Sequence, residues 1–443
     1  MYKSIFIFLL LLISDISSVF ISVYLSHIER VSLNVFSNFE DYSDSYDQYF
    51  SQGLFFLVLI SFYTFGLYAK RYDFWEELKN IIKALLLTLV LSILLVFATK
   101  TSNEYSRSMI LIIFLNLLWI MPLFRIIIKW LLSYFKLWQK YIWICGDSEQ
   151  VANLRPLFEK NWYFGYLPTM DSDQAQVVAI ATKDIPVNEL EEMIYRYKQQ
   201  KKEIFLLPYL HQLSFANSDV IDFMISRVSL FSLQNQLFKS RNIVIKKISE
   251  LFIIMVFFPF AFIVFLLLAL WVKLDSKGSI FFKQKRLGKN GKLFSCYKFR
   301  TMREGSEEDL KDYLKENPSE VDYFNKYHKY SVDPRFTRAG KWIRKLSLDE
   351  LPQIFNVLRG DMNLVGPRPY MREEGAKIES SKDIILHVKP GITGLWQVAG
   401  RNDLSFDERV DIDIWYIQNW SLWLDFVIFI KTFQVLISRR GAS

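Results

Sequence analysis

Cysteine is scarce in this chain of 443 residues, which contains only Cys145 and Cys296. The charge pattern places both in the cytoplasm, where thiols stay reduced, so we expect no disulfide. Nucleic-acid-binding motifs are also lacking, so the net charge of +8 favours anionic lipids and phosphorylated substrates as partners. No small-x-small cleavage site follows the first apolar run, and we therefore expect no cleavable signal.

Apolar sequence, in contrast, is abundant. Hydrophobic residues make up 51% of the chain and aromatic residues 17%, a composition too apolar for an ordinary soluble protein. Each apolar segment in the first third is near the roughly 20 residues that a spanning helix needs. We predict a membrane α-helical bundle of four spanning helices within residues 1–138, formed by Ile5–Leu25, Gly53–Tyr68, Ile81–Ala98 and Met109–Leu132.

Polar residues within and between these segments add two expectations. Asp15 and Asn116 are interpreted as groups that face the inside of the bundle, with ligand binding as the alternative. The loop that contains Glu40 and Asp44 is acidic, whereas lysines and arginines follow the second and fourth segments. Because basic residues mark the cytoplasmic side, the amino terminus and everything after residue 135 should be cytoplasmic.

Residues 139–240 alternate strand-like and helix-like segments, which predicts a small Rossmann-like α/β domain. A nucleotide site would need a glycine-rich turn after the first strand, Tyr141–Cys145. The turn there, CGDSEQ, has a single glycine, Gly146. The pattern favours a degenerate domain that serves as a structural or regulatory spacer over one that binds a dinucleotide.

The unbroken apolar run Leu251–Val272 is long enough to span a membrane. Basic residues flank it on both sides, so both of its ends should face the cytoplasm. Pro259 lies near its middle and would kink or break a helix there. We predict a re-entrant membrane hairpin over residues 250–273; a kinked fifth spanning helix is the alternative.

The tail, Phe406–Arg440, combines tryptophan and phenylalanine with basic residues, a pattern typical of amphipathic helices at a membrane interface. Its apolar part, Trp420–Leu436, contains Asp425 and Lys431. We therefore prefer interfacial C-terminal helices to a further crossing.

Basic side chains dominate residues 273–300, which contain nine lysines and arginines and one acid, Asp275. Most of this run is expected to contact anionic headgroups. Lys298 and Arg300 are better candidates for binding phosphate, because they lie in a compact KFRTM motif after a strand-like segment.

The acidic pair Asp349–Glu350 lies where Pro352 indicates a first helical turn. The spacing of Ser347 and Glu350 also fits a capping box, and this purely structural interpretation stays open. A carboxylate pair near a helix start can, however, supply a nucleophile and a metal ligand. Downstream, Arg368 lies between two prolines, and Arg401 ends a glycine-rich segment.

The second half of the chain contains six motifs in a fixed order. They are FxQxRxG (Phe282–Gly288), KFRTM (Lys298–Met302), DPRFTRxG (Asp333–Gly340), SLDELPQ (Ser347–Gln353), GDMNLVGPRP (Gly360–Pro369) and PGITGLWQVAGR (Pro390–Arg401). Residues 241–443 thereby resemble the monotopic phosphoglycosyltransferase, or bacterial sugar transferase, superfamily. The preceding helices and α/β domain resemble its long-form members, the undecaprenyl-phosphate galactose or glucose phosphotransferases. The chain departs from the family at Phe258-Pro259, where many members have Ser-Pro.

The resemblance implies a mainly helical catalytic domain in the cytoplasm, attached to a bacterial inner membrane. Asp349 would attack the β-phosphorus of a UDP-hexose, release UMP and form a phosphosugar-aspartyl intermediate that undecaprenyl phosphate resolves. Glu350 would assist, and both acids would hold Mg²⁺. Lys298, Arg344 and Arg368 match phosphate-handling positions of the family, and Asp413 matches a substrate-binding one less closely. The product would start an O antigen, capsule or exopolysaccharide, with galactose preferred and glucose as the alternative.

Two other classes of function fit the sequence less well. A catalytically silent membrane scaffold for glycan assembly has no reason to keep the acids together with Arg368. A multispan transporter does not account for the polar, motif-rich second half. We also expect a homodimer, because the spanning helices and the α/β domain add surface that the chemistry does not need.

Overall fold

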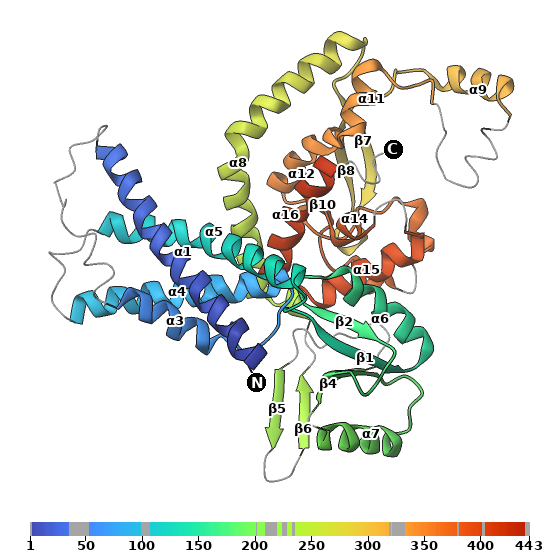
Figure 1. The fold of residues 1–443 in the computed structure, drawn as a ribbon. Coiled ribbons are helices and arrows are strands. Elements are labelled where there is room, and N and C mark those ends of the chain that lie inside the picture. The colour runs from blue at the N-terminus through green and yellow to red at the C-terminus, as the bar shows by residue number, and fades with distance from the viewer. Residues whose placement is uncertain are drawn as a thin grey trace. The chain divides into compact units, whose positions relative to one another are not determined.

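The computed structural model describes residues 2–34, 53–98, 107–200, 202–208, 219–223, 228–232, 235–318, 320, 333–378, 381–400 and 404–438. The chain forms two compact units, Met1–Tyr209 and Leu210–Ser443, whose elements are labelled in Figure 1. The amino-terminal helices and the parallel sheet share the first unit. The predicted boundaries at residues 138 and 240 stay predictions.

Three helices of the first unit, α1 (Tyr2–Asn34), α4 (Phe74–Ala98) and α5 (Arg107–Tyr134), are long and apolar enough to cross a membrane. The second predicted span is wrong in length, because α3 (Leu54–Thr64) has 11 residues. That is about 16 Å of helix, against a hydrocarbon core of about 30 Å. The chain turns at Gly66, whose φ of +69° is incompatible with a continuing α-helix.

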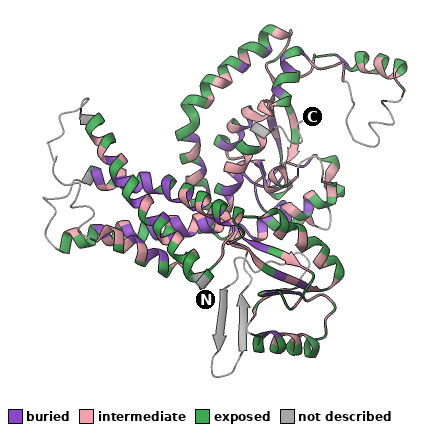
Figure 2. Cartoon of the chain, viewed as in Figure 1, coloured by how far each residue is buried: buried purple, intermediate pink, exposed green. Residues whose placement is uncertain are grey.

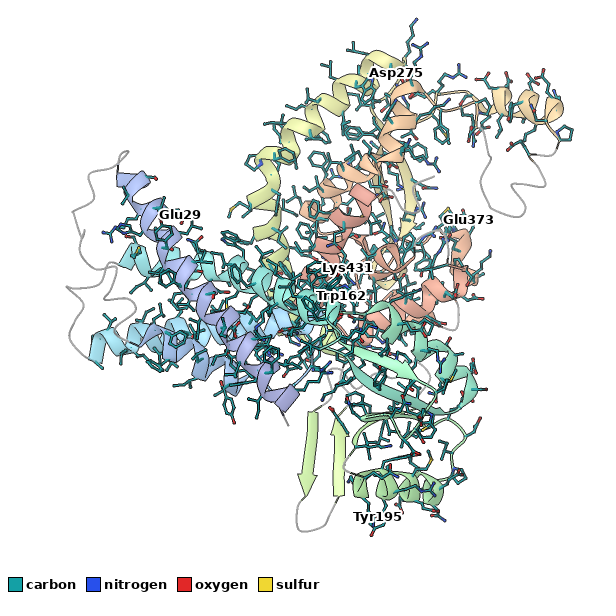
Figure 3. The ribbon with its side chains drawn as sticks, viewed as in Figure 1. Glu29, Trp162, Tyr195, Asp275, Glu373 and Lys431 are labelled. Atoms are coloured by element: carbon teal, nitrogen blue, oxygen red, sulfur yellow. The ribbon has the colours of Figure 1, made fainter. Side chains whose placement is uncertain are left out.

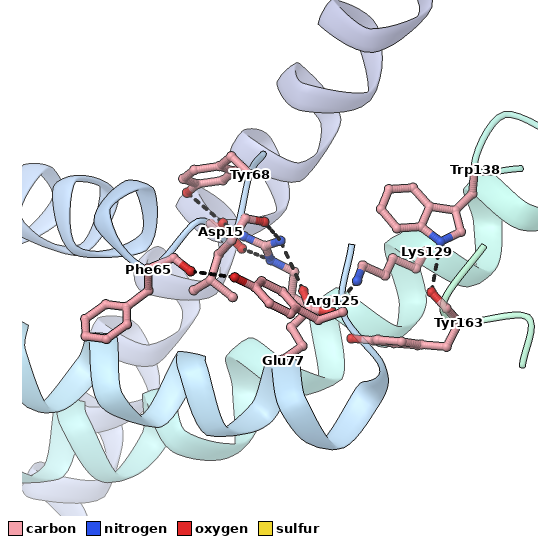
Figure 4. Close-up of polar contacts among 10 residues, drawn as sticks. Asp15, Phe65, Tyr68, Glu77, Arg125, Lys129, Trp138 and Tyr163 are labelled. Carbon is pink, nitrogen blue, oxygen red and sulfur yellow. Dashed lines mark hydrogen bonds and ion pairs between the residues drawn. The ribbon is translucent and has the colours of Figure 1, made fainter. Parts of the chain in front are cut away.

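A network of buried charges joins these helices (Figure 4). Arg125 of α5 is fully buried and pairs with Asp15 of α1, Nη2 to Oδ2 2.5 Å, and with Glu77 of α4, Nη1 to Oε1 3.3 Å. Lys129 also pairs with Glu77, and the Tyr68 hydroxyl donates to Asp15 at 2.7 Å. Charges in so apolar a setting persist only when they are paired.

The second predicted polar residue of the bundle, Asn116, donates to Ser26 Oγ and to Glu29 Oε2, each at 2.9 Å. Asp15 and Asn116 therefore both face partners inside the bundle, which confirms their interpretation as bundle-facing groups.

The α/β part contains a four-stranded parallel sheet in the order β2-β1-β3-β4. Its elements are β1 (Lys140–Gly146), α6 (Ser148–Lys160), β2 (Tyr166–Thr169), β3 (Val177–Ala181), α7 (Val187–Gln199) and β4 (Glu203–Leu207). Val177 and Ala179 pack in one core with α6 residues, while Val178 and Ile180 pack in another with α7 residues. Helices thus cover both faces, as the alternating pattern predicts.

The crevice where a dinucleotide would bind in such a sheet, between the carboxyl ends of β1 and β3, contains the protein's own side chains. Asp147 accepts from the amide of Gln150 at the start of α6 (2.9 Å), and Gln150 accepts from the amide of Lys183 (3.0 Å). A Cβ at Gly146 would collide with the carbonyl of Ala181, so this glycine is needed for strand packing. These contacts favour the structural interpretation of the domain.

Polar contacts join the sheet to the segment after α3. Arg71 donates to the carbonyl of Gly165 (2.8 Å) and stacks over the ring of Trp138 at 4.2 Å. Asn161 donates to Asp73 at 2.8 Å. Because of these contacts the helices and the α/β part form one unit.

The second unit is mainly helical, as predicted. Its first elements are the hairpin of β5 (Asp219–Phe223) and β6 (Val228–Ser232), followed by η1 (Gln236–Phe238) and the long helix α8 (Ser240–Asp275). The other elements are β7 (Phe281–Leu287), η2 (Lys289–Gly291), β8 (Leu293–Phe299), α9 (Glu307–Glu316), α11 (Arg338–Lys345), η3 (Leu348–Gln353), α12 (Ile354–Arg359), β9 (Asn363–Val365), η4 (Glu373–Ala376), α13 (Lys382–Ile385), β10 (Gly391–Thr393), α14 (Leu395–Ala399), α15 (Phe406–Gln418) and α16 (Leu422–Ser438).

Both ends of α8 pack on this unit. Near its start, Lys246 pairs with Asp425 of α16 at 2.5 Å, and Ile254 packs with Cys296 and Val357. Near its end, Leu268 packs with Phe299 and Ala339.

The last residue of α8 is anchored by a hydrogen bond. Asp275 is labelled in Figure 3, and its carboxylate accepts from the amide of Ala339 in α11 at 2.9 Å. Between the two anchored ends, α8 exposes its apolar side chains, as Figure 2 shows, with Phe260 at 73%.

The predicted hairpin does not form as two separate helices. One helix of 36 residues passes through Pro259 and follows a curved path along its unit (Figure 1). A proline removes one backbone hydrogen bond and bends a helix, but continuing the helix still satisfies the remaining amides in an apolar setting. With α1, α4 and α5, α8 gives four helices long enough to span a membrane in the described part of the chain.

The predicted tail helices exist as α15 and α16, and they supply much of the core of the second unit. Ile414, Tyr416 and Ile417 of α15 and Ile428 of α16 are buried together. Asp425 is also buried, and its carboxylate is satisfied there by hydrogen bonds from Trp420 Nε1 at 2.9 Å and from the Tyr416 hydroxyl at 2.6 Å. Contact of this tail with a membrane interface stays a prediction.

The charge network makes a testable prediction. In Arg125→Gln, Asp15 loses its buried partner, so we expect the free energy of unfolding to fall by about 3–5 kcal/mol. Lys83→Gln removes the same charge from an exposed position of α4 and should change it by less than about 0.5 kcal/mol. Thermal melting of the detergent-purified variants measures this difference, and equal melting temperatures would contradict the assignment.

Candidate active site

The antiparallel pair β7–β8 forms one wall of the site. Its register places Phe282 opposite Lys298 and Gln284 opposite Cys296. Because side chains alternate along a strand, Phe282, Gln284 and Arg286 lie on one face of β7. All three line the same cavity as Lys298.

The acidic pair lies on η3, a 3₁₀ helix that precedes α12. The predicted helix start near Ser347–Asp349 is confirmed, but its first turns are 3₁₀ rather than α. Ser347 is left-handed, with φ of +54°, and its side chain caps no amide. The capping-box interpretation of Ser347 and Glu350 is therefore wrong. A left-handed residue other than glycine costs on the order of 1 kcal/mol, and such strain is common beside functional groups.

The carboxylates are held in place by the apolar residues around them in sequence. Leu348 and Leu351 pack into the cluster of Leu268 and Val272 at the end of α8. Leu348 and Leu351 are one 3₁₀ turn apart and share one face of η3, so they fix Asp349 and Glu350 beside α8 while both acids line the cavity.

Lys298 bridges the acidic pair. Its Nζ lies 2.8 Å from Glu350 Oε1 and 3.8 Å from Asp349 Oδ2. Burial raises the pKa of Asp349 to about 6, while the charge of Lys298 acts in the opposite direction. The two carboxylates raise the pKa of Lys298 against the effect of burial, so this amine stays charged. A lysine and two carboxylates at this spacing can hold an anionic phosphate next to a nucleophile.

The cavity has a volume of about 710 Å³, enough for a nucleotide-sized ligand. It brings together five predicted site residues, Lys298, Arg300, Arg344, Asp349 and Glu350. Basic side chains, among them Lys298, Arg300 and Arg344, line the cavity together with the two acids. An anionic ligand is therefore favoured over a neutral one.

Two of the predicted arginines differ in their surroundings. Arg300 is buried and donates to the carbonyls of Ser276 (2.7 Å) and Lys277 (2.8 Å) directly after α8. Its guanidinium thus anchors the helix to the site. Arg344, on α11, stacks over the ring of Phe336 at 4.8 Å and its charge acts to lower the pKa of Asp349.

Arg368 lies on a loop that hydrogen bonds hold in place, and it does not line this cavity. Its guanidinium donates to Glu374 at 3.0 Å. Its backbone amide donates to Asp413 at 3.0 Å, and the Tyr370 hydroxyl donates to the same carboxylate at 2.8 Å. Asp413 is fully buried, and burial raises its pKa to about 7. Asp413 is therefore placed to position the Arg368 loop and not to touch a ligand in the cavity.

Arg401, the last predicted binding residue, lies outside the described residues. Sequence reasoning missed Arg286, which donates to Gln284 at 2.7 Å and has a buried Nε without a hydrogen-bond partner in the described chain. The alternation of Phe282, Gln284 and Arg286 along a strand that begins opposite Lys298 is the signal that places Arg286 on the face of that lysine. Trp396 and Gln397 also line the cavity and were missed.

The arrangement and the sequence define one class of protein. The model of the family "Bacterial sugar transferase" matches residues 241–439. Together with a relative 33% identical over most of both chains, this match shows that the chain belongs to the bacterial sugar transferase family.

Particular relatives cover both units. The chain is 33% identical over 85% of its length to the undecaprenyl-phosphate galactose phosphotransferase of Salmonella typhimurium and covers 84% of that protein. It is 31% identical over 85% of its length to the UDP-galactose-lipid carrier transferase of Erwinia amylovora, again with 84% covered. The undecaprenyl-phosphate glucose phosphotransferase of Komagataeibacter xylinus is 42% identical, but over 40% of this chain and 32% of that protein.

Proposed function

We propose that this protein transfers a hexose 1-phosphate, galactose 1-phosphate first, from a UDP-hexose to undecaprenyl phosphate and releases UMP. The observation that carries the proposal is the Asp349–Glu350 pair bridged by Lys298 in a cavity of nucleotide size. Family membership supports the reaction class. The product would begin a bacterial surface polysaccharide.

The residues suggest a two-step displacement. A carboxylate oxygen of Asp349 attacks the β-phosphorus, forms an O–P bond and breaks the bond from that phosphorus to the bridging oxygen, so UMP leaves with the electron pair. A phosphate oxygen of undecaprenyl phosphate then attacks the same phosphorus and regenerates the Asp349 carboxylate. Lys298 and Arg344 stabilise the negative charge on the transferring oxygens.

Magnesium is part of the proposal. The described residues contain no group of three or more His, Cys, Asp or Glu side chains that could hold a metal. Two neighbouring carboxylates nevertheless suit Mg²⁺, which takes one or two carboxylates together with substrate phosphates. Asp349 and Glu350 would hold the ion, which when bound neutralises charge on the diphosphate.

The site must also reach a lipid phosphate. We propose that α8 dips into the cytoplasmic leaflet and returns, with a bend at Pro259, because both of its ends pack on one unit. A helix that crossed would separate these ends by the membrane. Exposed apolar residues such as Phe260 would lie in lipid. This placement keeps the acids at headgroup level on the cytoplasmic side of an inner membrane.

Galactose is the first choice of sugar because two relatives that match 85% of the chain are named for galactose. The relative named for glucose matches a shorter part of this chain, so UDP-glucose is the alternative substrate. The homodimer stays a prediction. A silent scaffold is disfavoured by the intact charged cavity.

Removal of the nucleophile tests the reaction. In Asp349→Asn we expect UMP release from UDP-galactose to fall at least about a thousandfold, since amide oxygen is a poor nucleophile. Asp383→Asn, which removes an exposed acid of α13, should keep wild-type activity. Assays of purified protein with a panel of UDP-sugars, with and without Mg²⁺, measure both. Release by Asp349→Asn at the wild-type rate would exclude Asp349 as the nucleophile.

The raised pKa of Asp349 predicts a pH profile. The nucleophile must be ionised, so kcat/KM for UMP release should fall about tenfold per pH unit below about pH 6 and level off above it. Lys298 holds this pKa down, and the residual activity of Lys298→Met should therefore have its midpoint at higher pH. Initial rates from pH 5 to 9 test the shift; an unchanged or lower midpoint would show that the profile reports another group.

A further inference from the structure

A second cavity lies in the same unit near the start of α8. Its lining shares no residue with the cavity of the acids. Its volume is about 60 Å³, room for roughly four water molecules and so for a phosphate group, but not for a sugar nucleotide.

Three lysines from separate segments converge on this cavity. Lys247 lies on α8, Lys289 on the turn η2 and Lys389 after α13. The amide of Asn290 donates to the carbonyl of Leu386 at 2.6 Å, which fixes η2 beside the segment that carries Lys389. The Lys389 amine is also held close to Gly360, at the end of α12.

Within the described residues none of these three lysines forms an ion pair, although Glu250 and Asp361 attract Lys389. Glu250 lines the cavity but pairs with Lys246 at 2.9 Å, and Asp361 attracts Lys389 without forming an ion pair in the described chain. Burial and the charges of Lys247 and Lys289 lower the pKa of Lys389. Three like charges held together by the fold leave a site that an anion would stabilise.

The rim of the cavity indicates where this anion comes from. Ile243, Lys247 and Leu251 are spaced by four residues, so they share one face of α8, and all three line the cavity. The neighbouring side chains Ile248 and Phe252 are 63% and 60% exposed. An acyl chain can pack on this apolar face while its headgroup enters among the lysines.

We propose that the cavity of Lys247, Lys289 and Lys389 binds the phosphate of an anionic membrane phospholipid, with acyl chains along α8. Basic pockets beside membrane helices bind such headgroups, and each lysine adds about fivefold to the affinity. The bound lipid would anchor the start of α8 at the membrane surface. The proposal requires α8 to lie in lipid but does not depend on the chemistry of Asp349.

The test uses the full chain in mixed vesicles of phosphatidylcholine and phosphatidylglycerol, followed by detergent extraction and native mass spectrometry. The wild type should retain phosphatidylglycerol in preference to phosphatidylcholine. Lys289→Gln/Lys389→Gln should retain on the order of tenfold less. The matched control, Lys311→Gln/Lys377→Gln, removes two exposed lysines of the same unit that lie outside the basic run and do not line the cavity, and it should retain as much as wild type.

Equal retention by the pocket variant and the wild type, or an equal loss in the control, would overturn the proposal. Displacement of the lipid by inorganic phosphate alone would overturn the lipid assignment in favour of a soluble anion. Thermal melting checks that the variants fold, and Lys389→Glu provides a second variant with the same expected loss. UMP release is assayed in parallel, so failure of the proposed reaction and failure of this site are distinguished.

Discussion

The attachment of α8 to one folded unit at both of its ends constrains the rest of that unit. At its start, Lys246 pairs with the buried Asp425, and at its end Asp275 and the carbonyls after it bind Ala339 and Arg300. The apolar middle is left exposed. A helix that crossed a bilayer would place these two anchored ends on opposite sides of it, and this is the basis of the proposal that α8 dips into one leaflet and returns.

The position of the acids depends on the same constraint. Leu348 and Leu351 pack against the last turns of α8, so Asp349 and Glu350 are fixed beside the end of that helix. Burial raises the pKa of Asp349, and Lys298 keeps the pair partly neutralised. With a pKa of about 6, the proposed nucleophile Asp349 is ionised near neutral pH and is still basic enough to attack phosphorus.

Local sequence patterns predict most residues of the candidate site, but they do not predict contacts between residues far apart in the chain. The motifs identified Lys298, Asp349, Glu350 and Arg344, and all four line one cavity. Hydropathy overestimates the length of α3, because counting apolar residues does not reveal the turn at Gly66. The pairing of Lys246 with Asp425 joins residues 179 positions apart, which no local pattern indicates. For the same reason the sequence does not reveal that Arg300, which lines the cavity, also anchors α8, or that Asp413 supports the Arg368 loop.

Labelling of the two ends of α8 tests the central claim most directly. Single cysteines at Arg241 and Lys277, both exposed, are introduced into a chain with Cys145→Ser and Cys296→Ala, with Ser37→Cys in the acidic first loop as the reference for the outer side. A membrane-impermeant maleimide applied to intact cells should label Ser37→Cys alone, and all three should react after permeabilisation. Labelling of Lys277→Cys in intact cells would place the end of α8 outside and contradict the account.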